Sequence, residues 1–227
     1  MAPGTGWTWV FATARLRDPS VDAHTLDREN LQSALEKVGA SATVRDAFVL
    51  LTRDHEHSAG VDPGFDVVMA WRTIDPGIVT EELVRRGNEV WGPLAAAVTD
   101  PAVHSRAELC SFDASSLDGG WLVAVRVDFR ATEQDAEAQE RDFNEWYTYE
   151  HVGDICRGQG FHRGWRMQRD ASGDHQTYWV FYESDAAEDL VRSRAGKAPW
   201  GGLWAGVIDQ DTFCRSYHEI VARFHRP

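Results

Sequence analysis

The sequence is poor in cysteine, and the few cysteines it has do not form pairs. The chain of 227 residues contains only Cys110, Cys156 and Cys214. An odd number of cysteines without close spacing argues against a disulfide framework and against a paired CxxC metal site. We therefore expect three reduced thiols in the protein core.

Long hydrophobic runs are also missing. The longest apolar stretch, around Trp121 to Val127, is far shorter than the roughly 20 residues that a membrane helix needs. Residues 1–6 carry no basic segment of the kind that opens a signal peptide. These absences predict a cytoplasmic protein that does not enter a membrane.

Positive charge is scarce relative to negative charge. Lys and Arg together number 23, Asp and Glu 36, and the formal net charge is −13. A surface of this sign repels phosphate backbones and anionic lipids, so nucleic acid and membrane surfaces are excluded as expected partners. At 43% hydrophobic and 26% charged residues the composition is that of a folded globular protein.

Sequence motifs for several enzyme classes are absent. The chain has no GxSxG elbow, no P-loop and no dinucleotide-binding fingerprint, so it gives no support for a serine hydrolase, an NTPase or a Rossmann enzyme. Ten tryptophans are present instead. Such large side chains pack cores, and they also line cavities for apolar ligands.

An internal repeat organises the chain. The segment Glu81–Arg86 (EELVRR) recurs as Glu188–Ser193 (EDLVRS), and Trp91–Val98 (WGPLAAAV) recurs as Trp200–Val207 (WGGLWAGV). A short β-rich run precedes each copy, and a further expected strand follows it. The repeat predicts two structural units, residues 1–117 and 118–227, joined at a Gly-rich linker.

Hydrophobic periodicity predicts the same element order in both units, βαββαβ. In the first we expect strands at 7–14, 43–52, 65–72 and 105–112 and helices at 22–38, capped by Asp22, and at 79–98. In the second we expect strands at 121–129, 161–169, 177–183 and 212–223 and helices at 136–157 and 187–207. This order is that of the ferredoxin-like fold, an α+β unit with one open sheet face. Two tandem ferredoxin-like repeats can pack sheet against sheet.

Part of the second unit resembles a known family. The segment Phe143–His151 (FNEWYTYEH), the pair Gly160–Phe161 and the aromatic strand Tyr178–Tyr182 (YWVFY) are similar to the signature of EthD-like proteins. The tandem pattern as a whole resembles the dimeric α+β barrel superfamily in its fused form. Gly153 and Gln159 replace prolines that the family usually has. Residues 1–117 lack the signature.

The expected site centres on this motif. Tyr147, Glu150, His151 and Asp154 are spaced three or four apart on the predicted helix and so project from one face. An imidazole beside two carboxylates suits proton transfer, and the resemblance also emphasises His151. We expect His151, Glu150, Asp154 and Tyr147 to be catalytic, with a capping cluster at a helix end as the alternative.

The remaining site candidates lie around the same helix. We expect Trp146, Asn144, His162, Arg163 and Trp179 to bind substrate. Arg163 and Arg166 could hold an anionic group, and ion pairs with an acidic surface are the alternative for both. Elsewhere His55 and His57 form an HxH pair in a polar segment. Two ligands do not complete a metal site, so we expect an exposed loop there and no bound metal.

The resemblance implies small-molecule metabolism on an aromatic or polyketide-like substrate. Because no flavin or nicotinamide motif is present, we expect no cofactor and rank a lyase, cyclase or isomerase with His-centred acid–base chemistry first. A cofactor-free monooxygenase or a haem-binding barrel enzyme is the alternative, with His218 and His225 as candidate haem ligands. A non-catalytic binding protein is a third possibility. Exposed strand edges could also pair two chains into a homodimer.

Overall fold

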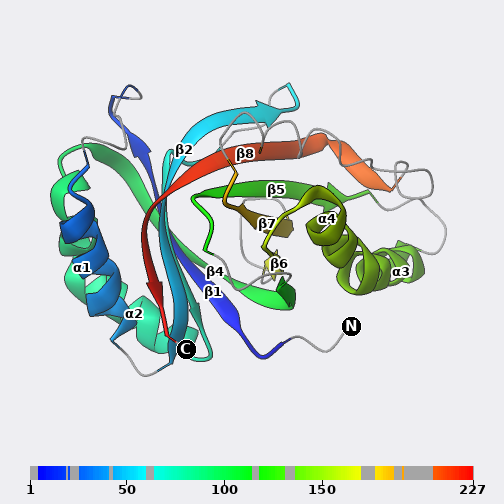
Figure 1. The fold of residues 1–227 in the computed structure, drawn as a ribbon, viewed down its shortest axis with the longest axis horizontal. Helices are drawn as coiled ribbons and strands as arrows, with labels where there is room; N and C mark the ends of the chain where they lie inside the picture. Colours follow the sequence, from blue (N-terminus) through cyan, green and yellow to red (C-terminus); the bar gives the residue numbers. More distant parts are fainter. Residues whose placement is uncertain are drawn as a thin grey trace. The chain divides into compact units, whose positions relative to one another are not determined.

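The structure is a computed structural model that describes residues 5–18, 20, 26–40, 43–59, 64–113, 118–130, 136–169, 177–186, 191 and 207–226. Its strands are β1 (Thr8–Leu16), β2 (Val44–His57), β3 (Val67–Thr73), β4 (Val98–Asp113), β5 (Trp121–Phe129), β6 (Arg163–Arg169), β7 (Tyr178–Ser184) and β8 (Ile208–His225). Its helices are α1 (Arg28–Gly39), α2 (Pro76–Arg86), the 3₁₀ helix η2 (Gly87–Leu94), α3 (Ala136–Trp146), the π-helix η3 (Tyr147–His151) and α4 (Val152–Gln159) (Figure 1).

The strands are hydrogen-bonded to their neighbours in the closed order β1-β3-β2-β8-β5-β7-β6-β4, a barrel in which β4 also pairs with β1. The chain divides into two compact units. Unit 1 comprises Met1–Thr5, Asp54–Pro63 and Glu108–Tyr217, and unit 2 comprises Gly6–Arg53, Gly64–Ala107 and His218–Pro227. The long strands β2, β4 and β8 therefore each contribute residues to both units.

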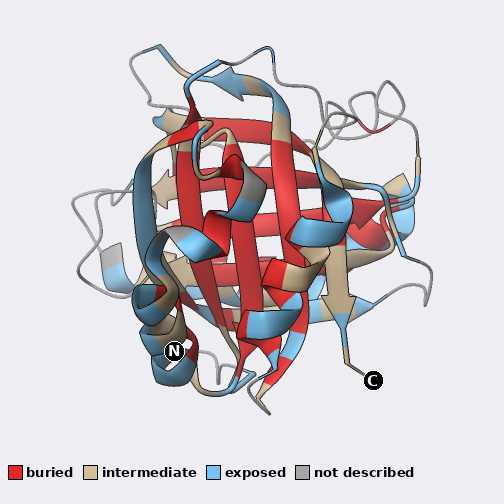
Figure 2. Ribbon diagram, turned by 90° about the vertical axis from the view of Figure 1, so that its left-hand side faces the viewer, coloured by how far each residue is buried: buried red, intermediate tan, exposed pale blue. Residues whose placement is uncertain are grey.

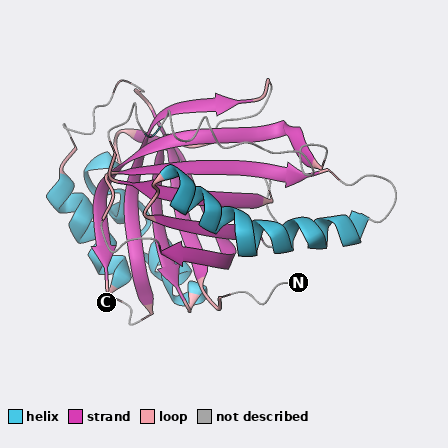
Figure 3. Ribbon diagram, turned by 45° about the vertical axis from the view of Figure 1, so that its right-hand side comes forward, coloured by secondary structure: helices cyan, strands magenta, loops and turns pink. Residues whose placement is uncertain are grey.

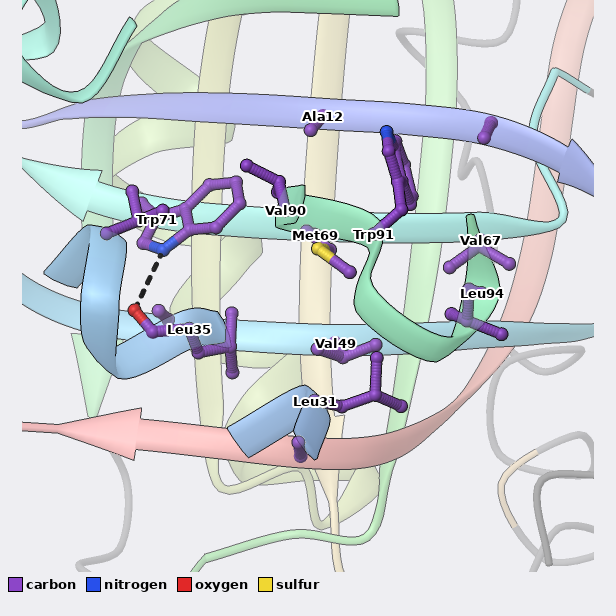
Figure 4. Packing of buried hydrophobic residues seen from close by; sticks show 14 of the residues in the cluster. Ala12, Leu31, Leu35, Val49, Val67, Met69, Trp71, Val90, Trp91 and Leu94 are labelled. Carbon is purple, nitrogen blue, oxygen red and sulfur yellow. Dashed lines mark hydrogen bonds between the residues drawn. The ribbon is translucent and has the colours of Figure 1, made fainter. Parts of the chain in front are cut away.

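Unit 2 contains β1, β3 and parts of β2, β4 and β8, together with α1, α2 and η2. One face of its sheet and the apolar sides of its helices form a core of aliphatic side chains and Trp residues. Trp71 donates a hydrogen bond from its indole nitrogen to the Leu35 carbonyl oxygen at 3.4 Å, which satisfies the buried N–H (Figure 4). In Figure 2 the outward residues of the helices are pale blue and the strands behind them are red.

Unit 1 contains β5, β6, β7 and parts of β4 and β8, covered by α3, η3 and α4, which run as one continuous helical rod (Figure 3). Its core is rich in aromatic rings, including Phe143, Tyr147, Tyr178 and Tyr182. The rod ends at Gly160, whose φ of 71° is left-handed and whose backbone N–H donates to the Cys156 carbonyl.

Several predicted boundaries need correction. The helix predicted over 79–98 begins at Pro76 and ends at Arg86, because Gly87 and Gly92 have φ of 49° and 47° and break the helical path. The last residues of that predicted helix form η2 and the start of β4 instead. Strand β2 continues to His57, so the HxH segment is strand and not loop.

The N-terminus of the first helix also differs from the prediction. Asp27, not Asp22, caps it, since its side chain accepts a hydrogen bond from the Asn30 backbone N–H at 3.1 Å. Asp22 itself lies outside the described residues. So does nearly all of the helix predicted over 187–207. The α+β class is confirmed, and the description as tandem ferredoxin-like repeats remains a prediction.

Among the described residues, no helix is both long and apolar enough to span a membrane.

Candidate functional site

The motif that the sequence singled out forms an irregular turn in the middle of the unit 1 helical rod. Tyr147–His151 is a π-helical turn between α3 and α4. Such a turn adds a residue to the local repeat, and it is often found at functional sites. It turns both Tyr147 and His151 toward the sheet, where they are buried.

His151 is enclosed by aromatic rings. Its side chain lies 4.5 Å from the Trp146 ring and 4.6 Å from the Tyr147 ring, measured between centroids, and the residue is only 9% exposed. Burial lowers the pKa of the imidazole to about 4, and the nearby Asp154 carboxylate opposes this shift only in part. At neutral pH His151 is therefore uncharged and a weak base.

The two acids predicted to assist His151 lie at the surface. Glu150 and Asp154 are both exposed, and the Asp154 carboxylate accepts a hydrogen bond from the Arg157 guanidinium at 2.9 Å. Asp154 is the carboxylate whose charge acts on His151. Tyr147, in contrast, is fully enclosed, and burial raises the pKa of its phenol to about 12.

A second group of predicted residues lies on β6, on β7 and just before β6. His162 lies 2.9 Å from the Asp185 carboxylate, and Arg163 pairs with three carboxylates, those of Asp113, Asp118 and Glu183. These contacts neutralise the cation that was expected to hold a substrate anion. Trp179 is buried, with its ring 5.6 Å from the Arg126 guanidinium.

A pocket of about 320 Å³ opens beside α3. This volume is at the lower end of the range for small-molecule sites. Of the residues predicted to bind substrate, only Asn144 lines it. The lining residues are Leu109, Glu137, Glu140, Arg141, Asn144, Thr148 and Gln168.

A buried arginine lies directly behind this pocket. Arg166 on β6 is 0% exposed, and its guanidinium donates to the Asn144 side-chain oxygen at 2.5 Å and to the Thr148 hydroxyl at 3.0 Å. The same guanidinium lies 4.7 Å from the ring centroids of both Tyr147 and Tyr178. Its hydrogen-bond partners within the described part of the chain are uncharged, and burial lowers the pKa of this guanidinium.

Tyr178 connects this arginine to a carboxylate. The Asn144 amide N–H donates to the Tyr178 oxygen at 3.0 Å, and the Tyr178 hydroxyl donates to Glu140 Oε1 at 2.5 Å. Burial, together with the hydrogen bond to Glu140, raises the pKa of the Tyr178 phenol to about 12. Tyr178 therefore keeps its proton at any physiological pH.

The prediction missed three members of this group as site residues: Glu140, Tyr178 and Thr148. One signal was present in the sequence, because Glu140, Asn144 and Thr148 are spaced four apart and so share a helix face. The sequence indicated Arg166, beside Arg163, as a group that could hold an anion, but its contact with Asn144 had no such signal. Its place behind Asn144 depends on how the strand and the helix pack.

No protein-family model matches the sequence, and no curated protein matches it. Solved structures do share the fold. A protein provisionally assigned as a chlorite dismutase superposes with a TM-score of 0.59 at 12% identity, covering 95% of both chains. A provisionally assigned monooxygenase from Fusobacterium nucleatum gives 0.58 at 11% identity, covering 97% of this chain and 94% of its own.

An anthrone oxidase-like protein gives a TM-score of 0.53 at 9% identity and covers 96% of this chain and 92% of its own. These structures share the overall fold of this chain, and membership of the dimeric α+β barrel superfamily remains a prediction. The EthD-like assignment remains a prediction. At such low identity the likeness extends to the fold alone.

A solved structure described as a haem-binding protein from Thermus thermophilus also shares this fold, with a TM-score of 0.52 at 12% identity, covering 96% of this chain and 94% of its own. The described residues of this chain do not fit haem. Iron in haem takes an axial His, Cys, Met or Tyr, and the lining of the pocket supplies none of these. His218 hydrogen-bonds to the Thr52 hydroxyl at 3.0 Å, and His225 to the Asp46 carboxylate at 2.7 Å, both in unit 2. Within the described residues no cluster of three or more His, Cys, Asp or Glu side chains could hold a metal ion.

Proposed function

We propose that the unit 1 pocket binds an uncharged aromatic ketone of the polyketide type and oxidises it with dioxygen, without a redox cofactor. The observation that carries the proposal is the buried Arg166, held behind the pocket wall by Asn144 and Thr148. The fold that the chain shares with provisionally assigned monooxygenases and an anthrone oxidase-like protein supports oxidation over the lyase, cyclase or isomerase reaction expected first.

A buried cation without a carboxylate partner is costly, and it is most useful where negative charge develops during a reaction. Aromatic rings of Phe143, Tyr147 and Tyr178 lie 5.5, 4.7 and 4.7 Å from the Arg166 guanidinium and compensate it only in part. A substrate that loses a proton in the pocket becomes an enolate. The positive field of Arg166 stabilises that enolate through the Asn144 amide and the Thr148 hydroxyl.

The proposed reaction needs only dioxygen as a second reactant. A ring CH₂ group next to the carbonyl system loses a proton, and the enolate passes electrons to O₂. A carbon–oxygen bond then forms to give a hydroperoxide, which loses water. The net change is R₂CH₂ + O₂ → R₂C=O + H₂O, in which the carbon is oxidised and both oxygen atoms are reduced.

Oxygen consumption with anthrone tests the proposal. The wild-type protein should consume one O₂ for each anthraquinone formed. Replacing Asn144 by Asp places a carboxylate against Arg166, which keeps the buried cation paired and the protein folded while neutralising its field. We expect kcat to fall by about 10²- to 10³-fold in this variant, as when a stabilising charge or donor is lost from an active site.

Arg166→Met is the complementary variant, with near-ultraviolet circular dichroism to check its fold. Oxygen uptake that is absent with anthrone and with hydroxylated anthrones would overturn the proposed function. So would equal activity of the wild type and a folded Asn144→Asp protein.

We retain His151 as a proposed contributor. Its pKa of about 4 leaves the imidazole uncharged and a weak base at neutral pH, so it does not supply the acid–base chemistry expected first. Its contacts with the Trp146 and Tyr147 rings hold it in place beside the aromatic core. Glu150, Asp154, His162, Arg163 and Trp179 keep their predicted roles only as proposals. A His151→Phe protein that folds and oxidises anthrone at the wild-type rate would remove His151 from the reaction.

A further inference from the structure

We propose that Glu140 is the catalytic base that takes the proton from the substrate, and that Tyr178 is the positioning residue that orients it. This inference deepens the proposed function and rests on it for the identity of the substrate. It is carried by the direction of the hydrogen bonds that connect the buried arginine to the pocket.

The direction of this series of hydrogen bonds is fixed at its buried end, at Arg166. A guanidinium can donate hydrogen bonds but cannot accept them, so the Asn144 side chain must present its oxygen to Arg166. The amide nitrogen of Asn144 then faces Tyr178 and donates to its oxygen. The Tyr178 proton is left to point to Glu140. No alternative assignment of the amide satisfies both contacts.

Every donor in this chain therefore points the same way, from Arg166 through Asn144 and Tyr178 to Glu140. Hydrogen bonds aligned in this manner polarise one another, and they favour negative charge at the accepting end. The accepting end is the carboxylate of Glu140, which lines the pocket. Tyr178 donates to Oε1 of this carboxylate, and within the described residues the other oxygen has no hydrogen-bond partner and can receive a proton from a bound molecule.

Tyr178 cannot itself be the base. Its phenol keeps its proton until far above neutral pH, and its hydroxyl is already engaged as a donor to Glu140. The Glu140 carboxylate, in contrast, is half-buried at the pocket and can change its protonation state without reversing the chain. When Glu140 accepts the substrate proton, the negative charge moves to the substrate. The substrate lies in the pocket, which Asn144 and Thr148 line.

The geometry also selects the type of proton that is removed. A carboxylate is a weak base, so the C–H or O–H group must be acidified by conjugation with a carbonyl, and the anion must be stabilised by Arg166. This requirement points to an enolisable aryl ketone that enters the pocket uncharged. In the step itself the C–H bond breaks, the proton forms an O–H bond on Glu140, and the electron pair stays on the substrate as the enolate.

Anaerobic hydrogen–deuterium exchange tests the base without the oxidation. Anthrone is incubated with the protein in D₂O in the absence of oxygen, and loss of the methylene proton signal is followed by NMR. The wild type should accelerate exchange over buffer. Glu140→Gln should lower the accelerated rate by about 10²- to 10⁴-fold, the usual contribution of a general base. Glu145→Gln, an exposed residue on the same helix, makes the same charge change and should exchange like the wild type.

A split between kcat and KM separates the roles of the two residues. Glu140→Gln removes the base, so kcat for exchange should fall by the full factor of about 10² to 10⁴. Tyr178→Phe keeps the ring but removes the donor that orients Glu140, so kcat should fall by a smaller factor while KM stays that of the wild type. An unchanged kcat in Tyr178→Phe would assign that residue to packing alone.

The outcomes distinguish this inference from the proposed function. Deuterium exchange that depends on Glu140 without any oxygen uptake would support the base and overturn the oxidation. Oxygen uptake that is equal in the Glu140→Gln and Glu145→Gln proteins would support the oxidation and overturn the base. Absence of both exchange and uptake in the wild type would overturn the two together.

Discussion

Protonation of His151 should make the protein less stable in acid, and the structure sets the size of the effect. Burial lowers the pKa of this imidazole from 6.5 to about 4. Above pH 6.5 the residue is neutral in both the folded and the unfolded chain and adds no pH dependence. Between pH 6.5 and 4 the unfolded chain binds a proton that the folded protein does not, so the free energy of unfolding falls as the pH falls.

The magnitude follows from the difference in pKa. One pH unit corresponds to about 1.4 kcal/mol, so His151 removes about 3 kcal/mol of stability by pH 4. Carboxylates also titrate in this range, and a matched variant removes their contribution. His151→Phe keeps an aromatic ring beside Trp146 and Tyr147 but cannot bind a proton.

The assay is urea unfolding of both proteins at several pH values from 7 to 4, followed by tryptophan fluorescence. The stability difference between wild type and His151→Phe should change by about 3 kcal/mol in favour of the variant as the pH falls. An NMR titration of the His151 ring should give a pKa near 4. Parallel pH profiles for the two proteins, or a measured pKa of 6 or more, would refute the reasoning.

Three further changes have expected effects on stability, each measured by urea unfolding at pH 7. Gly164→Ala should cost about 1 to 3 kcal/mol, because the new methyl group would lie 2.8 Å from a buried valine side chain, whereas Gly158→Ala meets nothing within 4 Å and should not destabilise the protein. Asp27→Ala removes the cap of α1 and should cost about 1 kcal/mol; an unchanged midpoint would contradict the capping role. Asp46→Asn weakens a buried carboxylate that joins an arginine at 3.2 Å and a histidine at 2.7 Å, with an expected loss of about 3 kcal/mol; a loss below 1 kcal/mol would show that the pairs contribute little.

Regular strands could be predicted from the sequence because alternation and apolar runs are local signals. The strand predicted over 121–129 matches β5 residue for residue, and the one predicted over 177–183 is shifted from β7 by a single position. The helix predicted over 136–157 also forms. The spacing of the sequence did not predict its π-helical turn at Tyr147–His151, because such a turn leaves no local pattern.

The site could be predicted only where its residues share one element. The motif drew attention to the correct helix and to Asn144, which lines the pocket. Glu140 lies one turn outside the motif and so was passed over. Arg166 and Tyr178 reach the site from separate strands, and nothing in the spacing of the sequence says that an arginine on β6 lies behind an amide on α3.

The long strand β8 has a consequence for synthesis of the protein on the ribosome. Unit 2 is built mostly from residues 6–107, yet it also needs residues 218–227, and the Arg226 backbone N–H donates to the Arg45 carbonyl at 2.8 Å. Domains usually fold in order as they leave the ribosome. The sheet that residues 6–107 begin is completed only when residues 218–227 have left the ribosome. The early strands must therefore be kept from aggregating until then, and a truncation near residue 217 should damage the part formed by residues 6–107 most.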